Sequence, residues 1–220
     1  MRVSEPSGGR LVAIDGAHGG DVSDAATALR EALIHRQATT GTSHWDASGL
    51  FGDILAAPAH QRDLSPRTLV LLYAADLAFR VRWEIVPALH RSMIVVAAPY
   101  VTTAISFGLA TGLSIEWLRT VFRFAPLPTR TIILREPKKA RSWKRKPKRG
   151  FGECCATLLE PTPEGFPRKK TWAAMVNALS AADGEHGGQF RTRDLRLVAQ
   201  EILTPRGRQA VQTSKRQRSR

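Results

Sequence analysis

The chain has 220 residues and a formal net charge of +14, and 43% of its residues are hydrophobic. This hydrophobic content excludes a wholly disordered chain, and the length fits one domain with a sizeable core. No apolar run reaches the ~18 residues that span a membrane, and residues 1–10 lack the apolar core of a secretion signal, so we expect a cytoplasmic protein.

The first predicted unit is a strand followed by a glycine turn and a helix. Residues 10–15 (RLVAID) form a short apolar run that predicts a buried strand. Residues 16–21 (GAHGGD) predict a glycine turn, and apolar residues then recur at helical spacing over 22–36. This order is typical of the opening of a parallel α/β unit.

Further helices and strands alternate along the rest of the chain. Residues 38–64 are mixed and carry turn signals, whereas a long helix is expected from Ser65 to about Arg91, because Ser65 is a good N-cap and Pro66 takes the first helical position. The other expected elements are a strand at 92–98, two short helices within 102–124, a strand at 129–135, and helices near 170–182 and 194–204. Such alternation predicts a three-layer α/β fold, a parallel sheet with helices on both faces.

The positive charge lies in two segments. Residues 135–149 hold nine Lys or Arg and one acid, and residues 205–220 hold six Lys or Arg and no acid, so the rest of the chain is neutral. We therefore expect one domain over 1–204, with a basic segment at 138–150, and a disordered basic tail at 205–220. Such appendages attract nucleic acid through phosphate contacts, or they are solvated segments with no physiological ligand.

The glycine turn has part of the pattern of a phosphate-binding loop. A working loop, G-x-x-x-x-G-K-[ST], needs glycines for close approach, a lysine for the phosphate charge and a hydroxyl for Mg²⁺. Gly16 takes the first glycine position and Ser23 the hydroxyl position. Asp21 stands at the second glycine and Val22 at the lysine, so the loop lacks the positive charge that a phosphate needs.

Several stretches, in order and spacing, resemble the thymidylate kinase family of nucleoside monophosphate kinases. The stretch I-D-G-A-H-G-G-D-V-S-D at 14–24 resembles the family's I-E-G-x-D-G-A-G-K-S-T, and L-Y-A-A-D-L at 72–77 resembles its L-F-A-A-D-R. The other matching stretches are P-A-L at 87–89, S-M-I-V-V-A-A-P-Y-V-T-T-A-I-S-F-G at 92–108, then G-L-S-I-E-W-L, and F-A-P-L-P-T-R-T-I-I-L-R-E-P. The resemblance covers residues 10–137 and implies a P-loop kinase-like fold.

The resemblance also implies phosphoryl transfer from ATP to dTMP, and the chain departs from the family at the charged positions of that chemistry. His18 replaces the loop carboxylate, Val22 the lysine, Leu77 the arginine that holds the acceptor phosphate, Ala98-Pro99 an Asp-Arg pair, and Gly108 a base-reading glutamine. A less secure alignment puts His44 where the family has a further arginine. Because cationic groups and Mg²⁺ supply most of this catalysis, these departures argue against the same reaction.

The resemblance defines two remnant sites. The remnant phosphate loop consists of Gly16, His18, Gly19, Gly20, Asp21, Val22 and Ser23. The remnant acceptor site consists of His44, Tyr73, Leu77, Ala98, Pro99, Tyr100 and Thr103. Tyr73 stands where the family stacks an aromatic ring on thymine, although an aromatic residue in a helix is also an ordinary core residue.

The basic segment stands where the family has a lid. Its cations are expected to contact a polyanion, or to be solvated: Lys138, Lys139, Arg141, Lys144, Arg145 and Lys146. In some family members lid arginines reach the ATP phosphates, so these side chains could in principle replace the missing lysine. They do not replace the Asp-Arg pair or the acceptor clamp.

Three functions follow from the sequence. The leading hypothesis is a non-catalytic binding or scaffold protein with a protein partner, without a cofactor. A divergent nucleotide kinase that uses ATP, Mg²⁺ and lid cations is the second, and a nucleic-acid-binding module is the third. A homodimer is expected through the long helix, with these residues available on its faces: Leu71, Ala74, Ala75, Ala78 and Val81. The adjacent Cys154 and Cys155 exclude a disulfide framework, and no pattern indicates a metal site.

Overall fold

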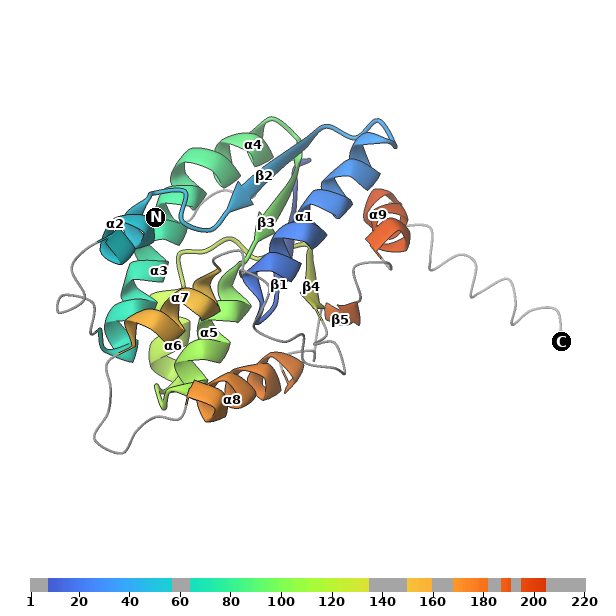
Figure 1. Cartoon of the computed structure of the whole chain (residues 1–220). Helices are drawn as coiled ribbons and strands as arrows, with labels where there is room; N and C mark the ends of the chain where they lie inside the picture. Colours follow the sequence, from blue (N-terminus) through green and yellow to red (C-terminus); the bar gives the residue numbers. More distant parts are fainter. Residues whose placement is uncertain are drawn as a thin grey trace, which may run out of the picture.

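The chain forms a parallel five-stranded sheet in the order β2-β3-β1-β4-β5. The computed structural model describes residues 8–56, 64–134, 150–159, 168–181, 187–190 and 195–204. The strands are β1 (Arg10–Asp15), β2 (Thr40–His44), β3 (Ile94–Ala98), β4 (Arg130–Leu134) and β5 (Gly187–Phe190). β1 is central and pairs with β3 from Arg10↔Ile94 and with β4 from Val12↔Arg130 (Figure 1).

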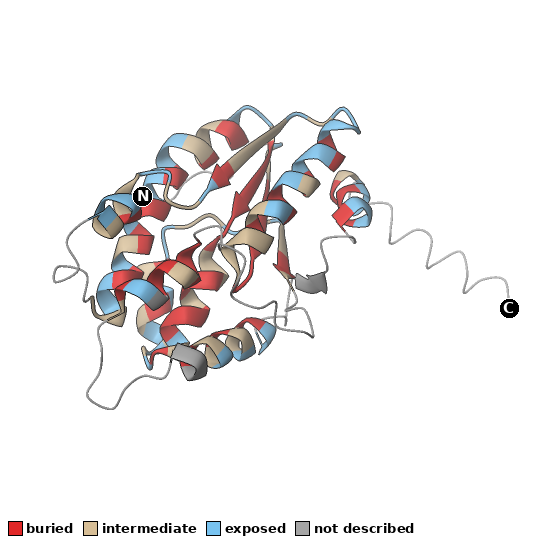
Figure 2. Cartoon of the chain, viewed as in Figure 1, coloured by how far each residue is buried: buried red, intermediate tan, exposed pale blue. Residues whose placement is uncertain are grey.

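Helices cover both faces of the sheet. On one face, α1 (Gly19–Ile34) and α9 (Leu195–Leu203) pack against Val12 and Ile14 of β1. The other face, with Leu11 and Ala13, holds the remaining described α-helices. These are α2 (Leu50–Ala56), α3 (Pro66–Arg80), α4 (Val86–His90), α5 (Val101–Ala110), α6 (Ile115–Val121), α7 (Phe151–Leu158) and α8 (Arg168–Ala181). Figure 2 shows the buried residues along the strands and on the inner helix faces. The expected three-layer α/β fold is confirmed.

The long helix expected from Ser65 to about Arg91 is present. The Ser65 hydroxyl accepts a hydrogen bond from the Thr68 N–H at 3.1 Å, as an N-cap should. Between α3 and α4 the helix widens into a π-helical turn, η2 (Val81–Ile85). Two of the five residues expected to be available for a dimer contact, Ala74 and Val81, lie in the core instead. The other three, Leu71, Ala75 and Ala78, are exposed.

Several elements differ from the sequence-based expectation. α1 begins at Gly19, three residues before the expected start, and β3 and β4 lie within the expected strands. β2 was not predicted because its sequence, TGTSH, is polar. It lies at an edge of the sheet and pairs only with β3 among the described strands. α2, α7 and β5 were also not expected. In the described part of the chain, no helix has both the length and the apolar character needed to cross a membrane.

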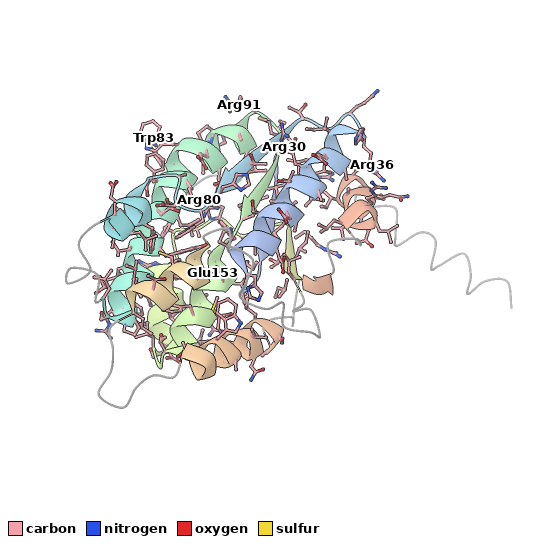
Figure 3. All side chains as sticks on the ribbon, in the orientation of Figure 1. Arg30, Arg36, Arg80, Trp83, Arg91 and Glu153 are labelled. Carbon is pink, nitrogen blue, oxygen red and sulfur yellow. The ribbon has the colours of Figure 1, made fainter. Side chains whose placement is uncertain are left out.

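A buried arginine joins three elements at the carboxyl end of the sheet. Arg80 lies on the last turn of α3 (Figure 3) and is fully buried. Its Nε donates to Ser43 Oγ at 2.9 Å, and its Nη2 donates to the carbonyl oxygens of Ser43 at 3.0 Å and Pro99 at 2.9 Å. The ends of β2 and β3 are thereby fixed to α3.

Asp76, one helical turn before Arg80, is equally buried and completes this arrangement. Its Oδ2 lies 3.9 Å from Arg80 Nη1. The same carboxylate accepts hydrogen bonds from the N–H of Asp46 at 3.1 Å and from the N–H and hydroxyl of Ser48 at 3.0 and 2.8 Å. The pair therefore also holds the loop that follows β2, and a buried charge pair is tolerated only with such hydrogen bonding.

Replacing Arg80 with Met is expected to lower the free energy of unfolding by about 3–5 kcal/mol, because Asp76 would stay buried without its counterion and three hydrogen bonds would be lost. Urea denaturation at pH 7 measures this. Arg30→Met, at an exposed position of α1, is the matched control and should change stability by less than about 0.5 kcal/mol. Equal midpoints for the two variants would contradict a structural role for Arg80.

Candidate functional site

The candidate site lies at the carboxyl ends of the strands, where ligands bind in open α/β sheets. Asp15, the last residue of β1, is fully buried. Its Oδ1 accepts hydrogen bonds from the N–H of Tyr100 at 2.8 Å, the N–H of Thr103 at 3.0 Å and the Thr103 hydroxyl at 2.7 Å. Asp15 therefore satisfies the first N–H groups of α5 and positions that helix beside the glycine turn. We call the surroundings of Asp15, Gly19 and Tyr73 the strand-end site.

Burial dominates the electrostatics of Asp15. Desolvation raises the pKa of its carboxyl group, and the hydrogen bonds from Thr103 and Tyr100 oppose that rise without cancelling it. The Thr103 hydroxyl also accepts a hydrogen bond from the Gly16 N–H at 3.2 Å. Asp15 and Thr103 thus hold the start of the glycine turn in place.

The turn between β1 and α1 contains only three residues, 16–18. The N–H of Val22 donates to the carbonyl oxygen of His18 at 3.0 Å, so Gly19, Gly20, Asp21, Val22 and Ser23 all lie in the first turns of α1. Val22 is 1% exposed and packs in the core, where a Cβ on Gly16 would lie 3.0 Å from its Cγ2. The position that the resemblance gives to a lysine therefore faces the core.

A carboxylate from α7 lies at the amino-terminal end of α1. Figure 3 labels this residue, Glu153. The N–H of Gly19 donates to Glu153 Oε1 at 3.1 Å and to Oε2 at 3.3 Å, and His18 Nδ1 lies 3.5 Å from Oε1. The ring of His18 also contacts Trp172 of α8, with centroids 4.7 Å apart. A helix amino terminus attracts anions through its unpaired N–H groups and its dipole, and here the chain itself supplies the anion.

An aromatic cluster lies beside this carboxylate. Phe151, two residues before Glu153, is 1% exposed. Its ring centroid lies 4.5 Å from that of Tyr73, 5.3 Å from that of Phe107 and 5.8 Å from that of Phe51. The Tyr73 ring, which the sequence offered as a base-stacking group or a core residue, is therefore a buried side chain covered by Phe151.

The other residues of the remnant acceptor site are buried, apart from one. Leu77 and Ala98 lie in the core, and Pro99 follows a cis peptide bond. Burial raises the pKa of both Tyr73 and Tyr100. The Tyr73 hydroxyl donates to the Tyr100 carbonyl oxygen at 2.6 Å, so these groups bond to the chain itself.

His44 and Gly108 have different surroundings. His44 is exposed at the end of β2, yet its pKa is lowered, first by partial desolvation and then by the charge of Arg80. A Cβ on Gly108 would lie only 2.5 Å from Leu118 Cδ2, so glycine at this position allows α5 and α6 to pack together. The six lid cations, Lys138 to Lys146, and the tail at 205–220 lie outside the described residues.

Sequence reasoning missed four residues that shape this site: Asp76, Arg80, Phe151 and Glu153. An arginine on a helix is usually exposed, so Arg80 carries no signal of its own. The segment Gly150–Glu153 (GFGE) does carry one, since two glycines flank an aromatic residue and a carboxylate follows. Glycines in such a pattern indicate a close approach to another part of the backbone.

The strand order, the helices on both faces and the glycine turn after β1 define a three-layer α/β fold of the P-loop kinase type. The chain is 41% identical over 69 residues to the probable thymidylate kinase of Pyrococcus abyssi, which covers 31% of this chain and 34% of that protein. It is 31% identical over 125 residues to the probable thymidylate kinase of Pyrobaculum aerophilum, covering 56% and 63% of the two chains. A third match is the thymidylate kinase of Xanthomonas campestris pv. campestris, 30% identical over 137 residues, or 62% and 60% of the two chains.

Each of these matches spans between about a third and less than two thirds of the relative's own length. No protein-family model matches the chain. The fold and the matches together support the assignment of this chain to the thymidylate kinase family.

The raised pKa of Asp15 predicts how stability depends on pH. Below the unfolded-state pKa of about 3.9 the carboxyl is protonated in both states. As the pH rises from there through the higher folded-state pKa, only the unfolded state ionises, and the wild type loses stability. Asparagine at position 15 does not ionise in either state. The stability of Asp15→Asn relative to wild type should therefore rise as the pH increases from the unfolded-state pKa to the folded-state pKa.

Chemical denaturation from pH 3 upward measures this difference. Asp53→Asn, which alters an exposed aspartate of α2, is the control and should show a smaller pH-dependent difference. A stability difference between wild type and Asp15→Asn that does not change with pH would contradict the raised pKa.

Proposed function

We propose that this protein is a non-catalytic, thymidylate kinase-like binding protein. One observation carries the proposal: the Glu153 carboxylate accepts the Gly19 N–H at the start of α1, the place where a phosphate would need that donor. A second anion at this place would be repelled by the first.

The surroundings of Val22 support the proposal. Phosphoryl transfer brings anionic groups together, and removing one charge-stabilising group commonly costs ~10²–10³ in rate. Val22 and Leu77, at the positions of a lysine and an arginine in the family pattern, are both buried among apolar side chains. These two apolar side chains offer neither a positive charge for ATP nor an oxygen ligand for Mg²⁺.

The acceptor side gives similar support. By the resemblance, a thymine ring would stack on the aromatic residue at position 73. Phe151 already lies against Tyr73 there, with centroids 4.5 Å apart. A base and the Phe151 ring cannot share one contact surface, because side chains in a core are close-packed.

A protein of this kind acts through a partner, and we propose a second copy of the chain as that partner. Three large apolar side chains on α3 and η2 are exposed: Leu71 at 48%, Phe79 at 40% and Trp83 at 65%. Arg82 lies over the Trp83 ring at 5.6 Å from its centroid. These three exposed side chains on one helical segment are the basis for placing the contact there.

The non-catalytic proposal predicts the outcome of a calorimetric titration. Purified, folded protein should give no binding heat with dTMP, and none with ATP plus Mg²⁺, at micromolar concentrations. The thymidylate kinase of Xanthomonas campestris, measured under the same conditions, is the positive control. Micromolar binding of both ligands, followed by dTMP-dependent ADP formation, would contradict the proposal and favour a divergent kinase. Loss of that turnover in Lys144→Ala/Arg145→Ala would assign it to the lid cations.

The dimer proposal predicts that light scattering gives twice the monomer mass of 24.2 kDa at micromolar concentration. Phe79→Ser/Trp83→Ser should shift the mass to that of the monomer, because it removes apolar area from the proposed contact. Leu197→Ser, at an exposed position on α9 across the sheet, is the matched control and should leave the mass unchanged. A monomer mass for the wild type would contradict the proposal.

A further inference from the structure

α7 contacts the strand-end site through two different side chains. Glu153 bonds to the Gly19 N–H with both carboxylate oxygens, although it lies 134 residues further along the chain. Phe151, on the same short helix, packs on Tyr73 and Phe107. One helix thus presents an anion to the start of α1 and a ring to the aromatic cluster.

A nucleoside monophosphate carries the same two groups, a flat ring and an anion. The start of α1 and the aromatic cluster attract these two groups, and α7 supplies both of them with Glu153 and Phe151. The start of α1 favours a negative charge, and a cluster of aromatic side chains favours another aromatic ring.

We propose that α7 is an intramolecular ligand of the strand-end site. The Glu153 carboxylate occupies the anion position and Phe151 the aromatic position, so a ligand with a phosphate and an aromatic base binds only when the amino-terminal half of α7 moves away. The inference rests on the proposed function in one respect: it takes the wild-type site as closed. It adds that the site keeps its affinity for anions.

The backbone contact between the two segments is close. A Cβ on Gly150 would lie 2.3 Å from Gly19 Cα, and a Cβ on Gly152 would lie 2.9 Å from the Ala17 carbonyl oxygen. Gly150 has φ −122° and ψ 174°, an extended conformation that any residue adopts. Glycine at position 150 is therefore required by the approach of α7 to the turn, and not by the backbone angles.

The far end of α7 is held separately. The N–H of Leu64 donates to the carbonyl oxygen of Leu158 at 2.8 Å, and Leu64 forms a parallel bridge with Leu159. Cys155 is buried in the same half of the helix, and burial raises the pKa of its thiol. These contacts anchor the carboxyl-terminal half, so displacement of Phe151 and Glu153 does not require release of the whole helix.

Two variants test the anion position, with inorganic pyrophosphate as the probe in calorimetric titration. Glu153→Gln keeps an oxygen that accepts the Gly19 N–H but removes the charge. Gly150→Ala leaves the glycine turn intact and separates it from α7 by steric overlap. Both should bind pyrophosphate at least tenfold more tightly than wild type. Gly41→Ala, where the new methyl group meets only atoms 3.7 Å away, is the control and should behave as wild type.

Hydrogen exchange reports whether α7 has moved. In Gly150→Ala the amide of Gly19, which donates to Glu153, and the amide of Cys154, which donates to the Gly150 carbonyl oxygen, should exchange faster, while the amide of Leu159, which donates to the Cys155 carbonyl oxygen, stays protected. The double variant Phe151→Ala/Glu153→Gln should in addition bind dTMP, which the wild type should not.

The proposal is overturned if Glu153→Gln and Gly150→Ala, both folded by circular dichroism, bind pyrophosphate no better than wild type. If Gly150→Ala does not fold, the result for Glu153→Gln decides alone. The proposed function fails by a different result, dTMP-dependent turnover by the wild type, so the two failures are distinguishable.

Discussion

The buried Arg80 guanidinium is the interaction on which the strand-end site depends. It fixes the ends of β2 and β3 to α3, and Asp76 beside it holds the loop after β2. Displacement of the guanidinium would break its hydrogen bonds to Ser43 and Pro99 and leave more buried polar groups unpaired. The position of Tyr73, three residues before Asp76 on the same helix, follows from this arrangement. Tyr73 belongs to the aromatic cluster that Phe151 of α7 covers, so the cluster and α7 pack against a helix that Arg80 holds in place.

The sequence allows prediction of those features that follow from local periodicity. The run RLVAID and the Ser65-Pro66 helix start have short-range signals, and the structure confirms both; the glycine turn is also signalled, but it is shorter than expected and ends at residue 18. β2 has no such signal, because an edge strand with the polar sequence TGTSH does not alternate. Phe151 and Glu153 could not be placed for a different reason: their contacts join segments far apart in the sequence, such as Gly19 with Glu153 and Tyr73 with Phe151, and no local pattern specifies that pairing.

The start of α1 shows how one electrostatic demand can be met in two ways. A helix that begins after a glycine turn presents unpaired N–H groups, and these require an acceptor whether or not a ligand is present. In this chain the helix begins early enough to bury Val22, and the acceptor is the chain's own carboxylate. The acceptor at the start of α1 can thus be a bound anion or a carboxylate of the chain. The apolar surroundings of Val22 and Leu77 agree with the second arrangement.

The contact between Gly19 and Gly150 has a consequence for how this chain can evolve. Neither position can accept a methyl group while α7 stays in place, and no smaller residue exists that would compensate at the other position. In the genetic code, glycine and alanine codons differ by a single nucleotide. A covered site and an uncovered one therefore stand one point mutation apart, so selection for ligand access would have a one-step route that leaves the sheet, the buried arginine and the glycine turn unchanged.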